Sequence, residues 1–277
     1  MVPVKVLCIG GSDSSGGAGI QADLKAVSAC GCYGLSVITA VTAQNTQGVQ
    51  FIHPVPQKFI LAQLDSVLSD IGADAVKTGM LLTAGAVESV IKKVKEYRLE
   101  KLIVDPVMVA KGGHSLMQDR SKDILIKKLL PLTFVVTPNI PEAEQLAQIN
   151  ITSIVAMKKA AVIIRKLGAK NVLIKGGHLP GNKRSGVIDI LFDGNHYYEF
   201  SSPWINTKNT HGTGCTYASA LASGIAQGKN IVDAAGRAKI MITSAIKNAF
   251  SLGKGYGSVN VLGKMFPLKK RGRYYLN

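Results

Sequence analysis

A glycine-rich segment late in the chain has the composition of an anion-binding loop. Residues 206–215 read Asn-Thr-Lys-Asn-Thr-His-Gly-Thr-Gly-Cys, and a helical pattern over residues 218–225 follows them. Unpaired N–H groups at a helix start attract negative charge, and glycines let an anion approach them closely. The segment is neither a Walker A loop nor the dinucleotide fingerprint, whose third position here is Tyr217. The sequence therefore predicts an anion site of another kind at three residues, Gly212, Thr213 and Gly214; a plain helix cap is the alternative.

Cys215 ends this segment and falls in the first turn of the predicted helix. Helix N–H groups lower the pKa of a thiol, so we predict a partial thiolate beside the anion site. Such a group acts as a general base towards a substrate hydroxyl. A small buried cysteine with no chemical role is the alternative interpretation.

Strand-like and helical patterns alternate over the first two thirds of the chain. Apolar strand-like segments occur at residues 4–9, 35–41, 75–77, 102–104, 134–136 and 172–174. Helical patterns occupy residues 18–29, 57–68 and 84–95, and others separate the later strands. This alternation predicts an α/β protein with a mainly parallel sheet covered by helices on both faces. Residues 186–200 instead alternate as a hairpin, and the final third is helical.

Polar residues follow each of the six strand patterns. Because the carboxyl ends of parallel strands lie on one edge, these residues are expected to meet in one ligand-binding crevice. Lys175 ends one strand and suits phosphate oxygens, whereas Asp105 and Glu142 offer hard oxygen ligands for Mg²⁺. Pro141 suits the first position of a helix, which places Glu142 in the first helical turn. The alternative to a metal ligand is therefore a carboxylate that only interacts favourably with the helix dipole. An anion cradle, a cation and a metal site together suit phosphoryl transfer.

Composition sets the remaining limits. The 277 residues carry 33 Lys and Arg against 17 Asp and Glu, a formal net charge of +16. No apolar run approaches the ~18–20 residues that span a bilayer, and the amino terminus resembles a first strand more than a signal peptide. These features predict a cytoplasmic protein with one domain over residues 1–262 and a basic tail over residues 263–277. The chain has one Trp, and basic and aromatic residues do not interleave outside the tail, so nucleic-acid binding is not expected.

Five separated motifs, in order, closely resemble the bacterial hydroxymethylpyrimidine/phosphomethylpyrimidine kinases of thiamine biosynthesis. The motifs are GGSDSSGGAGIQAD at residues 10–23, TAQNT at 42–46, DPVM at 105–108, KGGH at 175–178 and the segment at 206–215. The resemblance covers about residues 4–260 and leaves the tail without a counterpart. It implies the ribokinase-like fold, a three-layer α/β/α arrangement around a mainly parallel sheet, in a homodimer.

The resemblance also implies two ATP-dependent phosphorylations that use Mg²⁺. They act on the hydroxymethyl group of 4-amino-5-hydroxymethyl-2-methylpyrimidine and then on the monophosphate. Gln44 would hydrogen-bond the aminopyrimidine edge, and the other implied substrate contacts are Gly11, Asp23, Met80 and Val107. Residues implied to hold the nucleotide are Asn139, Lys175, Thr207, Gly212 and Gly214. The glycine segment would form the anion hole, Cys215 would be the base, and residues 109–118 would form a flap over the substrate.

Two alternatives stay open at this point. Pyridoxal or pyridoxine kinase activity uses the same scaffold, and its substrate is also a heteroaromatic ring with a hydroxymethyl group. Many ribokinase-like sugar kinases carry Asp where Cys215 stands, so the cysteine points to the pyrimidine and pyridoxal group, and Gln44 favours the pyrimidine. A protein of a different class, a non-catalytic ligand- or RNA-binding protein, would retain the fold without the chemistry.

Overall fold

A computed structural model describes residues 2–108 and 116–263 of the chain. Within them, nine strands form one sheet in the order β3-β2-β1-β4-β5-β6-β7-β8-β9. The strands are β1 (Lys5–Asp13), β2 (Tyr33–Asn45), β3 (Gly48–Pro54), β4 (Ala75–Thr78), β5 (Leu102–Val104), β6 (Val135–Val136), β7 (Asn171–Ile174), β8 (Val187–Phe192) and β9 (Tyr197–Ser202). The helices are α1 (Gly19–Ala29), α2 (Gln57–Asp70), α3 (Ala84–Glu96), α4 (Asp119–Ile124), α5 (Ile140–Ala147), α6 (Ile154–Lys166), α7 (Asn182–Ser185), α8 (Thr213–Ala226) and α9 (Ile231–Lys247). Most of the predicted flap and of the basic tail lies outside the described residues.

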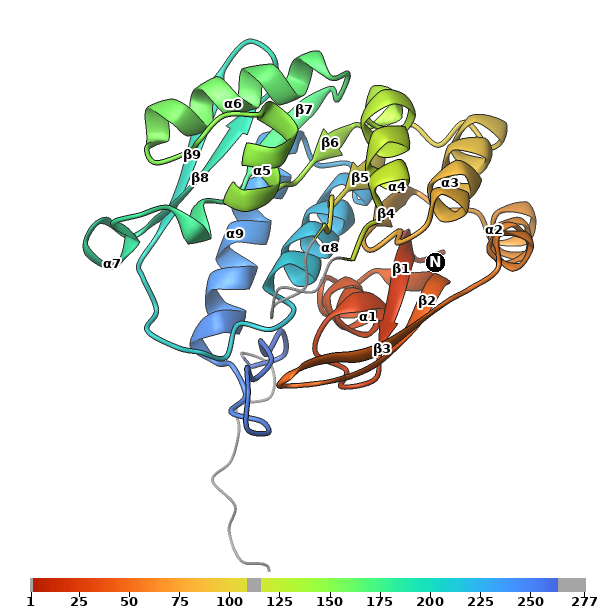
Figure 1. The fold of residues 1–277 in the computed structure, drawn as a ribbon, viewed down its shortest axis with the longest axis horizontal. Helices are drawn as coiled ribbons and strands as arrows, with labels where there is room; N and C mark the ends of the chain where they lie inside the picture. The colour runs from red at the N-terminus through yellow and green to blue at the C-terminus, as the bar shows by residue number, and fades with distance from the viewer. Residues whose placement is uncertain (1, 109–115, 264–277) are drawn as a thin grey trace, which may run out of the picture.

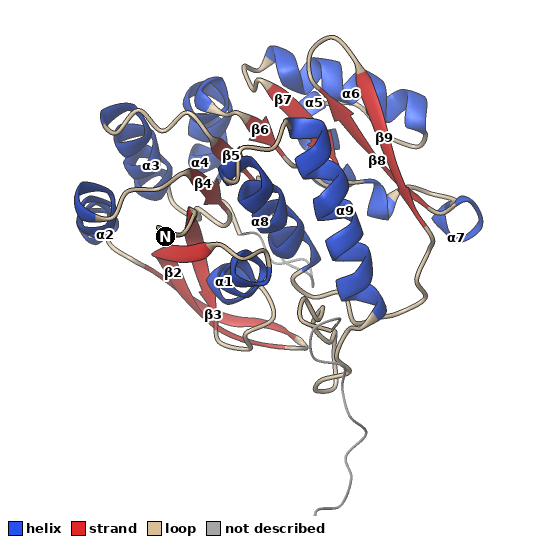
Figure 2. Ribbon diagram, turned by 180° about the vertical axis from the view of Figure 1, so that it is seen from behind, coloured by secondary structure: helices blue, strands red, loops and turns tan. Residues whose placement is uncertain are grey.

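Helices cover both faces of the sheet, as the alternating pattern predicts. Figure 1 shows the face beneath α3, α4, α5 and α6, and Figure 2 shows α1, α8 and α9 on the opposite face. Strand β1 is buried on both sides: Leu7 and Ile9 join the first apolar cluster, whereas Val6 and Cys8 join the second. This burial explains why the central strands are continuous apolar runs. The three-layer α/β/α fold is therefore confirmed.

The strand directions agree with the prediction in the centre of the sheet. Strands β2, β1, β4, β5, β6 and β7 pair in parallel. Strands β8 and β9 form the predicted antiparallel hairpin. Strand β3 pairs antiparallel with β2 at the other edge and was not predicted. Its sequence, Gly-Val-Gln-Phe-Ile-His-Pro, lacks a clear alternation, and Phe51 is 77% exposed, so no buried face marked it.

The first two strands extend farther than the sequence suggested. The polar residues placed after these strands lie within them, because β1 continues to Asp13 and β2 continues to Asn45. Pairing with β3 prolongs β2, and the β1–β2 register shifts between Gly10 and Gly11. Bulges of this kind re-aim neighbouring side chains and are common beside active sites.

The order of the strands fixes where a ligand binds. From β1 the chain proceeds to β2 and β3 on one side, and the strands from β4 onward lie on the other side. A crevice opens outside the carboxyl ends of the strands at such a point of reversal. Among the described residues, no helix is long and apolar enough to cross a membrane.

Candidate active site

A cavity of about 680 Å³ lies at the carboxyl ends of the parallel strands. Small-molecule sites typically enclose about 300–1,000 Å³. All the site residues expected from the sequence line this one cavity: Gly11, Asp23, Gln44, Met80, Val107, Asp105, Asn139, Glu142, Lys175, Thr207, Gly212, Thr213, Gly214 and Cys215. The predicted convergence of the strand ends is therefore confirmed.

The glycine turn, defined here as residues 212–214, begins helix α8. Gly212 is the N-cap, with φ of 80°, and no side chain caps the helix. A Cβ on Gly212 would collide with the carbonyl oxygen of Gly17, so both the backbone angle and the close approach require glycine. No side chain caps the start of α8, although the Thr213 N–H donates to the Thr210 carbonyl oxygen at 3.3 Å. The N–H groups of a helix start without a side-chain cap suit an anion.

The second glycine of the turn faces an ion pair. A Cβ built on Gly214 would lie 3.5 Å from both Asp105 Oδ2 and Lys175 Nζ. Lys175 Nζ lies 2.6 Å from Asp105 Oδ1, which also accepts a hydrogen bond of 2.9 Å from Thr137 Oγ1. Burial alone would raise the pKa of Asp105, but Lys175 and then Lys77 hold it below its usual range. The lysine thus stands charged beside the glycine turn.

Glu142 and Asn139 form a capping box at the start of α5. Asn139 Oδ1 accepts from the Glu142 backbone N–H, and Glu142 Oε2 accepts from the Asn139 backbone N–H, each at 2.9 Å. Burial raises the pKa of Glu142 to about 7; Lys175 opposes this rise and the Asp105 carboxylate adds to it. A buried carboxylate next to a second carboxylate is a group that a cation would stabilise.

The donor set fits a magnesium ion that is shared with a ligand. Mg²⁺ is usually held by one or two carboxylates together with substrate phosphates. Asp105 and Glu142 supply two hard oxygen ligands on the wall of the cavity. Among the described residues, no three His, Cys, Asp or Glu side chains gather as a metal cage. Two carboxylates would leave the other coordination positions of Mg²⁺ to ligand phosphates and water.

A buried ion pair missed by the sequence analysis lies between α1 and β4. Lys77 Nζ contacts Asp23 Oδ1 at 2.7 Å and Oδ2 at 2.9 Å, and Ser219 Oγ donates to Oδ1 at 2.8 Å. Both charged residues are 0% exposed. Burial alone would lower the pKa of Lys77, but Asp23 raises it above its usual range. The Asp23 carboxylate, expected to contact substrate, is thus held by two partners within the protein.

Cys215 lines the cavity in the first turn of α8, as predicted, but its thiol is not acidified. Burial raises the pKa of Cys215 to about 11; Lys77 lowers it, and Asp23 and Asp105 raise it further. The predicted partial thiolate is wrong, because desolvation outweighs the helix N-terminus. The thiol is protonated at neutral pH.

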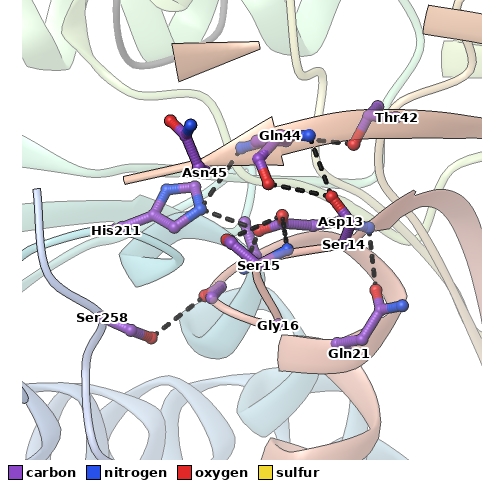
Figure 3. Close-up of polar contacts among 12 residues, drawn as sticks. Asp13, Ser14, Ser15, Gly16, Gln21, Thr42, Gln44, Asn45, His211 and Ser258 are labelled. Atoms are coloured by element: carbon purple, nitrogen blue, oxygen red, sulfur yellow. Dashed lines mark hydrogen bonds and ion pairs between the residues drawn. The ribbon is translucent and has the colours of Figure 1, made fainter. Parts of the chain in front are cut away.

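Gln44 belongs to a polar cluster with Asp13 and His211, the residue directly before the glycine turn (Figure 3). Its Nε2 lies 3.3 Å from His211 Nε2, and His211 Nε2 lies 2.8 Å from Asp13 Oδ2. Asp13 Oδ1 also accepts from the backbone and hydroxyl of Ser15, each at 2.8 Å. Because His211 directly precedes Gly212, one segment of chain joins Gln44 to the anion-binding turn.

An apolar cluster lies beside this polar one. Met80 packs with Ala40 and Leu116, and Val107 lies against them. A Cβ on Gly11 would collide with Met80 Cε, so glycine at that position makes room for the methionine. Met80, Val107 and Leu116 all line the cavity, which gives it an apolar wall suited to a flat ring.

Three functional candidates escaped the sequence analysis. Asp13 and His211 stand inside quoted motifs, but their 198-residue separation hid their contact. Lys77 lies in an apolar strand pattern, and a charged residue at such a position was the available signal.

A comparison with protein families matches residues 13–260 to the phosphomethylpyrimidine kinase family. The chain is 54% identical over 255 residues to the thiamine biosynthesis bifunctional protein ThiED of Geobacter sulfurreducens; the match covers 92% of this chain and 51% of that protein. It is 47% identical to a hydroxymethylpyrimidine/phosphomethylpyrimidine kinase of Bacillus subtilis, covering 92% of this chain and 94% of that protein. The chain thus spans about half the length of the bifunctional relative and nearly all of the other.

Solved structures agree with the fold. A phosphomethylpyrimidine kinase from Clostridium difficile superposes with a TM-score of 0.77 at 44% identity, covering 88% of this chain and 99% of that one. The pyridoxal kinase of Bacillus subtilis superposes with a TM-score of 0.88 at 38% identity, covering 95% of this chain and 99% of that one. With a family match over most of its length and relatives at these identities, the chain belongs to the phosphomethylpyrimidine kinase family.

Proposed function

We propose that this protein transfers the terminal phosphoryl group of ATP to the hydroxymethyl group of 4-amino-5-hydroxymethyl-2-methylpyrimidine, and then to the resulting monophosphate. Family membership and relatives named for these two steps support this function. A related pyridoxal kinase from Staphylococcus aureus has been solved with the ATP analogue AMP-PCP, which supports ATP as the donor.

One observation carries the proposal: residues 211–214 adjoin both the part of the cavity that contains Gln44 and the part that contains the Lys175–Asp105 ion pair. His211 contacts Gln44, the expected ring-binding residue, at 3.3 Å. Gly214 faces the Lys175–Asp105 ion pair, with a 3.5 Å approach to each partner. A phosphoryl group held at the glycine turn therefore lies between a cation and a ring pocket, as in-line transfer requires.

The chemistry follows from these positions. In the first step the hydroxymethyl oxygen attacks the terminal phosphorus of ATP, a new P–O bond forms, and the bond to the β-phosphate oxygen breaks to release ADP. The start of α8 and Lys175 stabilise the negative charge that moves onto the leaving phosphate. Cys215 accepts the hydroxyl proton once its own thiol proton has passed to solvent, and the re-formed thiol releases a proton to solvent before the next turnover. In the second step a phosphate oxygen of the monophosphate is the nucleophile, so no hydroxyl proton needs to leave.

Magnesium, quaternary structure and location belong to the same proposal. Asp105 and Glu142 would hold Mg²⁺, which when bound neutralises phosphate charge. Their carboxylates are oxygen donors; burial, and to a smaller extent the Asp105 carboxylate, raises the pKa of Glu142, and a bound cation would favour its ionised form. The homodimer and the cytoplasmic location expected from the sequence remain predictions.

Pyridoxal kinase activity is the second candidate. The Bacillus subtilis pyridoxal kinase superposes with a TM-score of 0.88, against 0.77 for the phosphomethylpyrimidine kinase from Clostridium difficile. Sequence identity favours the pyrimidine: 47% to the pyrimidine kinase against 38% to the pyridoxal kinase, both from Bacillus subtilis. One extra or missing contact in a ring pocket changes specificity by ~10–200-fold, so the two substrates need direct comparison.

The test is incubation of the protein with ATP, Mg²⁺ and the aminopyrimidine alcohol, followed by mass analysis. We expect the monophosphate and then the diphosphate to accumulate, each with one equivalent of ADP. The same measurement with pyridoxal gives the competing kcat/KM. A larger kcat/KM for pyridoxal, or ATP turnover with neither ring, would refute the proposed substrate.

A further inference from the structure

Four groups around Gln44 form a hydrogen-bonding cluster that the mechanism above does not use (Figure 3). His211 Nε2 lies 2.8 Å from Asp13 Oδ2 and 3.3 Å from Gln44 Nε2. Gln44 Oε1 lies 3.2 Å from Thr42 Oγ1, which lies 2.9 Å from the carbonyl oxygen of Ser12. Asp13, Thr42 and His211 are buried, so water does not replace these partners freely.

The position of each proton in this cluster follows from its acceptors. Burial opposes a charge on Asp13, but hydrogen bonds from His211, Ser15 and Ala18 lower its pKa to about 2. An ionised carboxylate only accepts hydrogen bonds, so the proton between Asp13 and His211 belongs to His211 Nε2. A backbone carbonyl also only accepts, so the single hydroxyl proton of Thr42 points to Ser12.

Both neighbours of the Gln44 amide are then defined. The protonated His211 Nε2 has no lone pair, so it cannot accept a hydrogen bond from the Gln44 amide; its N–H points mainly to Asp13 Oδ2 at 2.8 Å and is shared with Gln44 at the longer distance of 3.3 Å. Thr42 Oγ1 presents an acceptor. The amide satisfies both when its oxygen faces His211 and its NH₂ faces Thr42, a half-turn of the amide group that exchanges two atoms of similar size. The opposite setting would face donor to donor and acceptor to acceptor, which is unfavourable in a buried site.

We infer that His211, held by Asp13, fixes the direction of the Gln44 amide and thereby makes the site selective for a 4-aminopyrimidine over a 4-oxopyrimidine. This inference rests on the proposed function, in which Gln44 binds the pyrimidine edge. Asp13, Thr42 and His211 are positioning residues, because they act through Gln44.

The selectivity arises from the edge of the amide that remains free. One oxygen lone pair and one N–H of Gln44 stay available, and they match the amino group and the adjacent ring nitrogen of the aminopyrimidine. In a 4-oxo ring that carries its proton on the adjacent nitrogen, the donor and the acceptor exchange places. If the amide is fixed, its oxygen faces the oxygen of the oxo ring and its N–H faces the ring N–H, so these polar groups stay unpaired. If the amide can turn freely, it pairs with either ring while the ring keeps the same orientation.

The test compares kcat/KM for the aminopyrimidine alcohol with kcat/KM for its 4-oxo analogue. We expect the unaltered protein to prefer the amino compound by about tenfold to a hundredfold. His211→Phe removes the donor but keeps a ring in place, and the preference is expected to fall to about threefold or less. Thr42→Val removes the acceptor on the other side, and a fall in the same direction is expected. Asp13→Asn lets Nε2 lose its proton, with the same expected effect.

Ser258→Ala is the matched control. The Ser258 hydroxyl lies 3.4 Å from the carbonyl oxygen of Gly17, near His211 but without a hydrogen bond to the Gln44 cluster. The preference of the Ser258→Ala variant for the amino compound over the 4-oxo compound is expected to equal that of the unaltered protein. A folded His211→Phe protein with unchanged preference would overturn the inference, and if that variant does not fold, an unchanged preference in Thr42→Val would do so. If the unaltered protein does not phosphorylate the aminopyrimidine at all, the proposed function itself has failed.

A second measurement is independent of turnover. The histidine tautomer is read from ¹⁵N–¹H correlation spectra of the labelled protein, with His211→Phe used to assign the signal. We expect a proton on Nε2, because this nitrogen lies 2.8 Å from the Asp13 carboxylate. A His211 ring protonated on Nδ1 alone would overturn the inference even if the selectivity result agreed.

Discussion

Lys175 Nζ lies 2.6 Å from Asp105 Oδ1, and this ion pair ties the carboxyl end of β7 to that of β5 beside the glycine turn. Asp105 is 2% exposed, so its carboxylate is shielded from water and holds the lysine firmly. In the proposed mechanism the lysine would therefore meet the phosphate already charged and oriented, which reduces the reorganisation needed when a nucleotide binds.

The two glycines of the turn should respond differently to alanine. Gly212→Ala places a Cβ against Gly17 O at a φ of 80°, and we expect it to lower the free energy of unfolding by at least about 1–3 kcal/mol. Gly214→Ala meets only ordinary 3.5 Å contacts inside a helix, so stability should be unchanged or slightly higher. The added methyl lies at the phosphate position, so KM for ATP should rise at least tenfold. Urea denaturation and steady-state kinetics test both; equal destabilisation by the two changes would contradict the structure.

Removal of the Cys215 thiol tests its role as base. Cys215→Ala should lower kcat for the first phosphorylation by ~10²–10⁴-fold while nucleotide binding persists. A kcat within about threefold of normal would exclude the role.

The pH dependence of Cys215 alkylation is a separate prediction. Because burial holds the thiol pKa at about 11, the rate of reaction with iodoacetamide should rise about tenfold per pH unit from pH 7 to 9 without a plateau. Mass analysis of the peptide that contains Cys215 gives the rate. A plateau near pH 7 would mean an acidic thiol.

The Lys77–Asp23 pair should show strong coupling in a double-mutant cycle. Lys77→Met or Asp23→Asn alone leaves a buried polar group without its partner, and a loss of about 3–5 kcal/mol of unfolding free energy is expected. The double change Lys77→Met/Asp23→Asn should cost much less than the sum of the two single losses. Additive losses, measured by urea denaturation, would argue against a buried pair.

Glu142 should make the protein less stable as pH rises. Its pKa is raised from an ordinary value of 4.5 to about 7 in the folded protein, so the folded state holds the proton over this interval while the unfolded chain has released it. Unfolding free energy should therefore fall from about pH 4.5 to pH 7, by roughly 3 kcal/mol. Glu142→Gln preserves the capping box and should remove this part of the slope. Parallel slopes for the two proteins in EDTA would contradict the raised pKa.

Gln44→Ala should act on the pyrimidine alone. Loss of the amide removes the expected contacts to the ring edge, so KM for the aminopyrimidine should rise about tenfold or more. KM for ATP should stay within twofold, because the hydrogen bonds of Gln44 go to Ser14, Thr42 and His211 and not to Lys175. An unchanged pyrimidine KM would remove Gln44 from the ring pocket.

Much of the fold was predictable because it rests on local patterns. Apolar runs separated by helical periods indicated the parallel strands, and the turn at Asp193-Gly194-Asn195 marked the β8–β9 hairpin. Strand β3 was not predictable in this way, since it is an edge strand whose side chains are mostly exposed. The continuation of β1 and β2 through polar residues depends on partners that the local sequence does not reveal.

The sequence by itself determined most of the residues that reach the cavity, because the carboxyl ends of parallel strands must share one edge of the sheet; Asp13, Lys77 and His211 also line it and were missed. Only the tertiary structure decided what those residues are next to. Burial, not the helix N-terminus, controls the Cys215 thiol; Lys77 holds Asp23; and His211 contacts Asp13 across 198 residues of chain. Desolvation and charge pairing depend on distances in space, and those distances are set by the packing of α1, β4 and α8 together.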